Sequence, residues 1–494
     1  MKKRHQIVVM TLVSIFLFIL CGCQKAPIEK AVVNKNESNY KSGPVDISEG
    51  SHSESGDEQQ AFTTSFSSTD GSVTFNVNIM PPVVDNNTQT VKVSSHFLTE
   101  DDAKRVATSL FPDVEFYEAE PPQSENLSKS EIQQRIHRWS QYADFSALKS
   151  LYGDTYSDAA LTDMQETIKS FVENYTLRYE SASAENTHQK CMWKWRKTLD
   201  YLLSEEELIG IDTSDSNDEI STQLTYDDVP YCFTASTRNK SDYKVNLLSA
   251  YIYTGMGPAN LDENVIRAQL ARTAEPTQSD IDTVKAKAEK MLAEMNLGTW
   301  QIDECYVDVQ EYGKATEYTI CVNAVPAFGS TSTLRHTQLS SLKNKDGYAP
   351  EQYYTDVNFA FSAEGDLISF NMYTPVEIKE TINTEVMSIS SLLERAQIFL
   401  TNTDSYAYGY GNYLPLIDES VQCIVDISSA EVGLSRIKVQ NEDDSYFYVP
   451  SVLLKGISTY VGEETDRVFY ASTEPESILC INAIDGTIIS ACGM

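Results

Sequence analysis

Apolar and polar residues alternate along the chain soon after residue 61, and this alternation predicts β-strands. Val73, Phe75, Val77 and Ile79 are separated by polar residues, and a period of two is typical of a strand that packs one face on a core. The same alternation returns between residues 91 and 97. We therefore expect ordered structure to begin near residue 61 with an antiparallel β-meander.

Three later segments carry apolar residues at helical spacing, each behind a capping signal. In each segment a Ser or Thr stands three residues before an acidic residue, which is the spacing of a capping box. The pairs are Thr99 with Asp102, Thr277 with Asp280, and Ser391 with Glu394. Because an apolar stripe follows each pair, the pattern predicts three amphipathic helices.

A hairpin pattern also occurs twice. Residues 358–369 align without gaps on residues 479–490. Both segments read as an alternating strand, an acidic residue followed by Gly365 or Gly486, and a second strand. Chance similarity of two hairpins is one explanation. Since a predicted helix precedes the hairpin in both segments, we favour internal duplication.

Residues 126–210 break the β pattern. Ile132, Ile136 and Trp139 recur at helical spacing, and a second amphipathic run covers residues 164–172. The chain has no proline between residues 122 and 230, as expected of long helices. This part of the chain therefore reads as a helical insertion.

Together these patterns predict an α+β fold of tandem antiparallel sheets, each with a helix packed on it. Gly-Pro and Thr-Ala-Glu-Pro sequences mark a domain boundary between Met256 and Pro276. The expected units are an N-terminal α+β domain at 61–260 with the helical insertion at about 126–210, one module at 273–385 and a second module at 386–494.

The helix followed by an acidic-Gly hairpin resembles PepSY-type modules, and also the related α+β modules of the YycH/YycI extracytoplasmic regulators of Gram-positive bacteria. The likeness covers roughly residues 273–494, with a fainter trace at 89–120. The architecture is also similar to that of a family of uncharacterised clostridial lipoproteins, a likeness that includes Phe447-Tyr448-Val449-Pro450. The resemblance implies PepSY-like modules that inhibit or regulate partners outside the membrane. It implies no catalytic residue.

The N-terminus carries the most specific signal. Three basic residues, Lys2 to Arg4, precede an apolar run from Ile7 to Leu20, as in a secretory signal peptide. The run ends in Leu20-Cys21-Gly22-Cys23, which resembles a bacterial lipoprotein signal. This implies removal of residues 1–22 and lipidation of Cys23. A plain signal peptide with incidental cysteines is the alternative. We expect the protein to be anchored in the cell membrane and exposed on its extracytoplasmic face.

Composition and charge further narrow the class of protein. Hydrophobic residues make up 41% of the chain, enough to build packed cores, whereas residues 23–60 are mainly polar and predict a disordered tether. The formal net charge of −34 argues against nucleic-acid binding, because phosphates would be repelled. The chain has only one long apolar stretch, so we exclude a membrane protein with several spanning helices.

Known catalytic and metal-binding motifs are missing from the sequence. The six histidines form no zinc-hydrolase motif, and neither a nucleophile elbow nor a phosphate-binding loop occurs. The oxygen-rich segment Asp212–Glu219 lacks the glycine and the bidentate glutamate of a calcium-binding loop. We therefore assign no catalytic residue, metal or cofactor, and a hydrolase that uses paired carboxylates is the least favoured class.

Two groups of residues are candidate sites. Cys305 and Cys321 flank a predicted hairpin around residues 312–314, so a cross-strand disulfide is one interpretation and small buried thiols are the other. The segment 406–413 places four tyrosines on a backbone rich in small residues, as adaptable binding loops do. These are Tyr406, Tyr408, Tyr410 and Tyr413. Packing within their own module is the alternative.

The function expected from these observations is a non-catalytic binding or regulatory module for an extracytoplasmic protein or peptide partner, presented by the tether. Its acidic charge would favour cationic partners by steering. The alternative is a lipoprotein that binds cell-wall glycan or a solute, for which the tyrosine-rich segment would be the platform.

Overall fold

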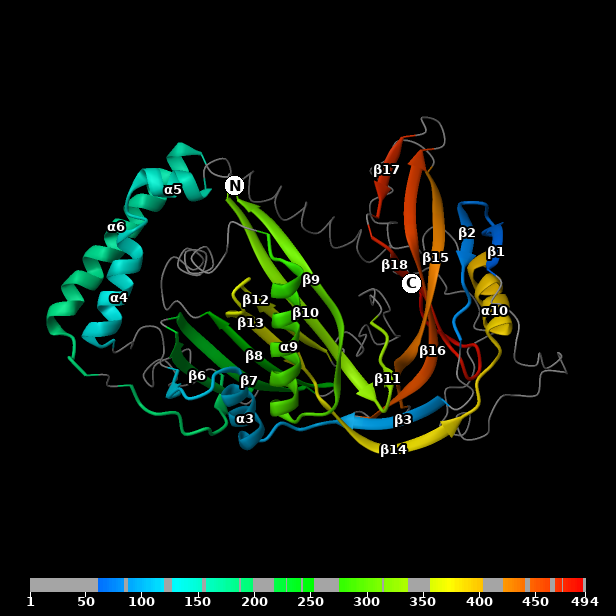
Figure 1. Ribbon diagram of the computed structural model, residues 1–494, viewed down its shortest axis with the longest axis horizontal. Helices are drawn as coiled ribbons and strands as arrows, with labels where there is room; N and C mark the ends of the chain where they lie inside the picture. The colour runs from blue at the N-terminus through cyan, green and yellow to red at the C-terminus, as the bar shows by residue number, and fades with distance from the viewer. Residues whose placement is uncertain are drawn as a thin grey trace, which may run out of the picture.

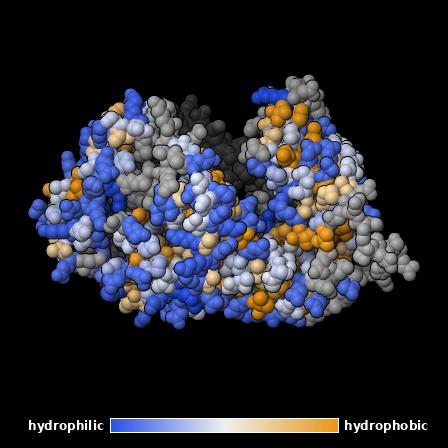
Figure 2. All heavy atoms as spheres, in the orientation of Figure 1, coloured by the Kyte–Doolittle hydropathy of each residue, from blue (hydrophilic) through white to orange (hydrophobic). Residues whose placement is uncertain are grey.

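Two large β-sheets and six helices account for the regular structure of the described residues in the computed structural model (Figure 1). The described residues are 61–83, 88–119, 127–152, 157–185, 188–198, 217–227, 229–240, 243–252, 275–312, 315–335, 356–402, 421–439, 445–462, 467–472 and 474–491. Within them, no helix is long and apolar enough to cross a membrane. In the space-filling view a notch at the top separates the two sheets (Figure 2).

The first of these sheets, here called the middle sheet, is built from residues 117–373 and is antiparallel throughout. Its order is β11-β10-β12-β13-β8-β7-β6-β4, with β9 on β10 and β5 on β6. The strands are β4 Tyr117–Glu118, β5 Arg196–Lys197, β6 Asp218–Tyr226, β7 Val229–Lys240, β8 Tyr243–Ile252, β9 Trp300–Tyr312, β10 Ala315–Phe328, β11 Thr331–Ser332, β12 Val357–Phe361 and β13 Leu367–Tyr373.

The second, the terminal sheet, combines strands from the two ends of the described chain. Its order is β1-β2-β15-β16-β18-β19; β3 pairs with β14 and β16, and β17 pairs with β16. All its pairs are antiparallel except β2 with β15. The strands are β1 Phe62–Ser67, β2 Val73–Ile79, β3 Thr88–Ser95, β14 Val376–Thr384, β15 Val421–Lys438, β16 Ser445–Gly462, β17 Val468–Ala471, β18 Glu476–Asn482 and β19 Ile488–Ala491.

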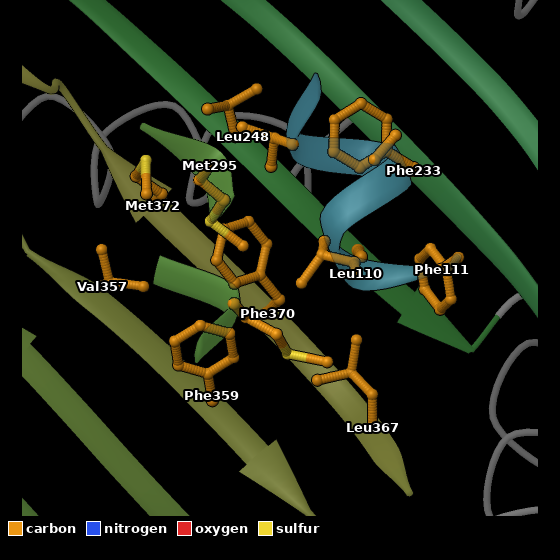
Figure 3. Close-up of a cluster of buried hydrophobic side chains, with 14 of the residues drawn as sticks. Leu110, Phe111, Phe233, Leu248, Met295, Val357, Phe359, Leu367, Phe370 and Met372 are labelled. Atoms are coloured by element: carbon orange, nitrogen blue, oxygen red, sulfur yellow. The ribbon is translucent and has the colours of Figure 1, made fainter. Parts of the chain in front are cut away.

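Three helices cover these sheets. Helices α3 (Glu100–Leu110) and α9 (Gln278–Met295) pack on the middle sheet. Their core centres on Phe370, which is fully buried and lies among side chains of α3, α9 and the strands (Figure 3). Helix α10 (Ile389–Thr401) packs on the terminal sheet through Leu392, Leu393, Ala396 and Leu400. Each sheet therefore has its own hydrophobic core.

The expected helical insertion is present as α4 (Lys129–Ser140), α5 (Phe145–Tyr152) and α6 (Asp158–Ser181). These helices have a small core of their own, formed by Trp139, Leu148, Leu161 and Ile168. They extend from one end of the middle sheet, at the left of Figure 1.

The predicted tandem of PepSY-like α+β modules is wrong, because the structure is mainly β with two large sheets. Strand β8, in the range predicted for the N-terminal domain, pairs with β13 of the range 273–385. Likewise β3 pairs with β14 and β16. The residues around Met256 lie outside the described part of the chain, but the strands on both sides of the predicted boundary share one sheet.

The repeated pattern does correspond to a repeated order of elements. After α9 the chain forms β9, β10, β12 and β13, in which each strand pairs with the next of the four. After α10 it forms β15, β16, β18 and β19 with the same pairing. Gly365 and Gly486 take positive φ values of 88° and 71° in the two short turns, a conformation that glycine adopts without strain.

Within the described residues the chain crosses from one sheet to the other at two neighbouring places. One crossing is between β3 and α3, and the other is between β13 and β14. His96 lies at this joint: its Nε2 is 2.9 Å from Asp102 Oδ2 on α3, and its Nδ1 is 3.1 Å from Glu377 Oε1 on β14. The His96 amide donates to Pro375 O at 2.7 Å, and Asn246 Nδ2 of β8 donates to His96 O at 2.7 Å. Side chain and backbone therefore tie both crossings together.

Candidate functional site

A cleft of about 470 Å³ separates helix α4 from the edge of the middle sheet at β4, β6 and the start of β7. Ligand sites are typically concave, with a few polar groups that converge on the ligand. The lining residues are Val114, Glu115, Tyr117, Leu127, Ser128, Ser130, Glu131, Gln134, Arg135, Ala184, His188, Gln223, Leu224, Thr225, Pro230 and Tyr231.

A capping box fixes the start of α4 beside this cleft. Ser128 Oγ accepts from the Glu131 amide at 3.4 Å, and Glu131 Oε2 accepts from the Ser128 amide at 2.8 Å. The other carboxylate oxygen, Oε1, is 2.9 Å from His188 Nε2. Because the His188 side chain is only 6% exposed, this contact ties the segment after α6 to the first turn of α4.

Glu131 is held as a carboxylate. Burial raises its pKa, but hydrogen bonds from His188 and from Ser128 outweigh that effect and lower the pKa to about 2. A group with this pKa carries no proton to donate near neutral pH. It acts as a fixed acceptor and a fixed negative charge.

Neighbouring groups at the mouth of the cleft are also engaged with one another. Glu115 accepts from the Tyr117 hydroxyl at 3.0 Å and contacts Lys190 Nζ. The Lys190 and Tyr117 contacts lower the pKa of Glu115, whereas burial and the Glu115 contact raise the pKa of Tyr117. These pairs define the shape and charge of the mouth.

Four other lining side chains make no hydrogen bond within the described chain. Ser130 and Gln134 stand one helical turn apart on α4 and therefore share a face. Gln223 and Thr225 are two positions apart on β6, so they too point to one face. Two helix side chains and two strand side chains thus line opposite walls of the cleft. Hydroxyl and amide groups donate and accept, so they suit a neutral polar ligand.

The thiol of Cys191, which follows Lys190 in the chain, is not activated. Burial raises the pKa of Cys191 to about 12, and a thiolate, not a thiol, is the nucleophile. In the described part of the chain, no group of three or more His, Cys, Asp or Glu side chains is placed to hold a metal ion.

Most residues singled out from the sequence are not at this cleft. Cys23 and the four tyrosines at 406, 408, 410 and 413 lie outside the described residues. The predicted hairpin that carries the two cysteines is formed by β9 and β10, but the Cys305–Cys321 disulfide is not formed. Cys305 pairs with Val322, and Cys321 with Tyr306. This one-residue offset puts the two thiols on opposite faces.

Sequence reasoning missed the cleft residues. The Ser128 and Glu131 spacing is a readable capping box, but Gln223, Thr225 and His188 carry no local signal of a site. They come together only because the insertion folds back on the sheet edge through the Glu131–His188 contact.

Comparisons with known proteins give a structural likeness only. No protein-family model and no curated protein matches the sequence. Among solved structures, the chain is similar to the crystal structure of an uncharacterized protein from Eubacterium rectale ATCC 33656. The similarity covers 87% of this chain and 93% of that one, at 9% identity with a TM-score of 0.33.

Proposed function

We propose that this protein is an extracytoplasmic lipoprotein, anchored at Cys23, that binds a protein or peptide partner without catalysing a reaction on it. The observation that carries the binding role is the cleft between α4 and β6. Ser130 and Gln134 on one wall, with Gln223 and Thr225 on the other, leave donors and acceptors open. Peptide groups of a partner present the complementary donors and acceptors.

The chemistry of the cleft supports binding rather than acid–base catalysis. A general acid or base works best with a pKa near the working pH. The hydrogen bonds of Glu131 hold its pKa at about 2, and burial holds the pKa of Cys191 at about 12, so neither group exchanges protons readily near neutral pH. The anchoring part of the proposal is supported by the signal-like N-terminus that ends at Cys23.

A pull-down from native membranes tests the proposal. Gln134→Ala combined with Gln223→Ala should lower the amount of captured partner about tenfold, since each lost neutral hydrogen bond weakens binding roughly threefold to tenfold. Gln133→Ala is the matched control, because Gln133 is an exposed neighbour on α4 that does not line the cleft. Undiminished capture by a correctly folded double variant would contradict the role of the cleft.

The anchor is tested separately. Cys23→Ala should release the protein from the membrane fraction or leave it as an unprocessed precursor. If this variant stays in the membrane with the processed mass, the lipoprotein part of the proposal fails and the cleft is unaffected.

A glycan or solute is the second candidate ligand. The volume of about 470 Å³ is within the range of small-molecule sites, and Tyr117 lines the same cleft with aromatic surface on which a sugar ring can pack. Binding of soluble wall-glycan fragments, measured by calorimetry and abolished by the same double variant, would favour this candidate over a peptide partner.

A further inference from the structure

The outer edge of strand β14 is open within the described chain, because β14 pairs with β3 alone. The His96 amide donates to Pro375 O at 2.7 Å, which identifies Pro375 and His96 as a hydrogen-bonded pair of the ladder. In an antiparallel pair the bonded and non-bonded positions alternate. The N–H and C=O groups of Val376 and Ile378 therefore point away from β3, toward the open edge.

An apolar groove of about 390 Å³ adjoins this edge. It runs between the turn after α9, the end of β10 and the first residues of β14. Its lining residues are Leu297, Gly298, Thr299, Trp300, Pro326, Ala327, Phe328, Val376, Glu377 and Ile378. Ile378 is 59% exposed, and Figure 2 shows hydrophobic side chains gathered where β3 ends and β14 begins. An open strand edge and a side-chain pocket thus lie together.

Trp300 lines the groove, and its indole N–H lies buried beneath the surface. Its indole Nε1 is buried and has no partner among the described residues. A buried indole N–H usually finds an acceptor, and leaving such a group unpaired costs free energy. A carbonyl oxygen of a bound peptide could pair with Nε1 only if the atoms that cover it moved aside.

The charged side chains along β14 determine which peptides its edge favours. Glu377 and Glu380 are both exposed on β14, with Lys379 between them, and Glu385 follows the strand. Lys379 Nζ already contacts Glu377 Oε2 at 2.5 Å. Lys92 of β3 lies opposite Glu380, so the four acidic and basic residues of β14 and its end, together with Lys92, leave one excess negative charge within a protein of formal charge −34, and basic side chains beside the edge are favoured.

We propose that the open edge of β14 binds an extended basic peptide by strand addition. The peptide pairs with the backbone of Val376 and Ile378, places one apolar side chain in the Trp300 groove, and sets basic side chains beside Glu377 and Glu380. Backbone pairing gives affinity in this mode, and pockets give specificity. The register shift between Ile378 and Glu380 limits the paired stretch to the start of β14. This site shares no lining residue with the cleft between α4 and β6 and goes beyond the proposed function.

The probe for this proposal is a fluorescein-labelled heptapeptide of alternating lysine and leucine, titrated with the purified full-length protein and followed by fluorescence anisotropy. In a strand, either the lysine amides or the leucine amides face the neighbouring strand. N-methylation of one set should abolish binding, whereas methylation of the other set should leave it within about twofold. Loss with both sets or with neither, or no binding of the parent peptide, would overturn the proposal.

Variants of the protein test the same contact between the peptide and β14. Ile378→Pro removes an outward N–H and should weaken binding about tenfold, while Ile378→Val keeps the N–H and should bind like the wild type. Trp300→Phe should weaken binding about threefold. If Ile378→Pro does not fold, the N-methylated peptides decide the question.

A glutamate–leucine heptapeptide tests the charge. It should bind at least tenfold more weakly than the lysine peptide, and equal binding would overturn the preference for basic partners. These titrations use no cellular partner. If they fail while the cleft variants still lose capture in the pull-down, the strand-addition site is wrong and the proposed binding function stands.

Discussion

Replacing Asp102 by asparagine should weaken the joint between the two sheets in a pH-dependent way. Asp102 is buried in the first turn of α3. Its Oδ2 accepts from the Thr99 amide at 2.9 Å and lies 2.9 Å from His96 Nε2, and its Oδ1 accepts from the Arg105 guanidinium. Asparagine keeps the shape and a capping acceptor but removes the negative charge.

The magnitude follows from the pKa of this carboxyl. Burial raises the pKa of Asp102, but hydrogen bonds from Thr99 and the contact with His96 outweigh burial and lower it from 3.8 to about 2. This difference corresponds to between about 2 and 3 kcal/mol. Because His96 is 23% and Arg105 is 36% exposed, solvent screens part of it, and we expect about 2 kcal/mol. A depressed pKa stabilises the folded state above pH 3.8, and the gain is lost as the pH falls toward 2.

Urea unfolding followed by circular dichroism measures this effect. At pH 7 Asp102→Asn should unfold with about 2 kcal/mol less free energy than the wild type, and the difference should shrink to less than half by pH 2.5. Asp280→Asn is the matched control, because Asp280 makes the same capping bonds with Thr277 on α9; it should cost about 1 kcal/mol. A difference for Asp102→Asn that is equal at both pH values would refute the electrostatic reasoning.

Three further predictions concern packing and cysteine chemistry. Phe370→Ala should cost about 3 to 5 kcal/mol in urea unfolding, because the ring is fully buried, and a loss below 1 kcal/mol would contradict its central position. Gly456→Ala should lower the melting temperature, since a Cβ there would lie 2.3 Å from Asp426 O; an unchanged melting temperature would show that the strands separate readily. Mass spectrometry of the unreduced protein should find Cys305 and Cys321 both alkylated, and a crosslinked peptide would contradict the register of β9 with β10.

Local sequence signals predicted local structure well. The capping boxes at Thr99 and Thr277 begin α3 and α9 as expected. The third box was placed one turn late, because Ser388 caps α10 and its side chain accepts from the Ser391 amide. The spacing of apolar residues does not show at which residue a helix starts. In a serine-rich segment, the sequence therefore does not identify which serine is the N-cap.

The pairing of strands that lie far apart in the sequence could not be predicted in the same way. Alternation shows which residues of a strand face a core, but it does not say which strand lies beside it. The parallel pairing of β2 with β15 and the sharing of the middle sheet by β8 and β13 follow from tertiary packing. The cleft depends on the same kind of contact, because α4 and β6 meet only after the insertion folds back.

The terminal sheet has a consequence for the order in which the protein folds. Asn76 of β2 donates to Asp426 of β15, 350 positions later in the chain. At a synthesis rate of about 5 to 20 residues per second, β2 waits roughly 20 to 70 s for its neighbour β15. All strands of the middle sheet are made within that interval, so it can fold first. The early strands meanwhile expose unpaired edges that invite aggregation, and a chaperone that shields them would have most effect during this wait.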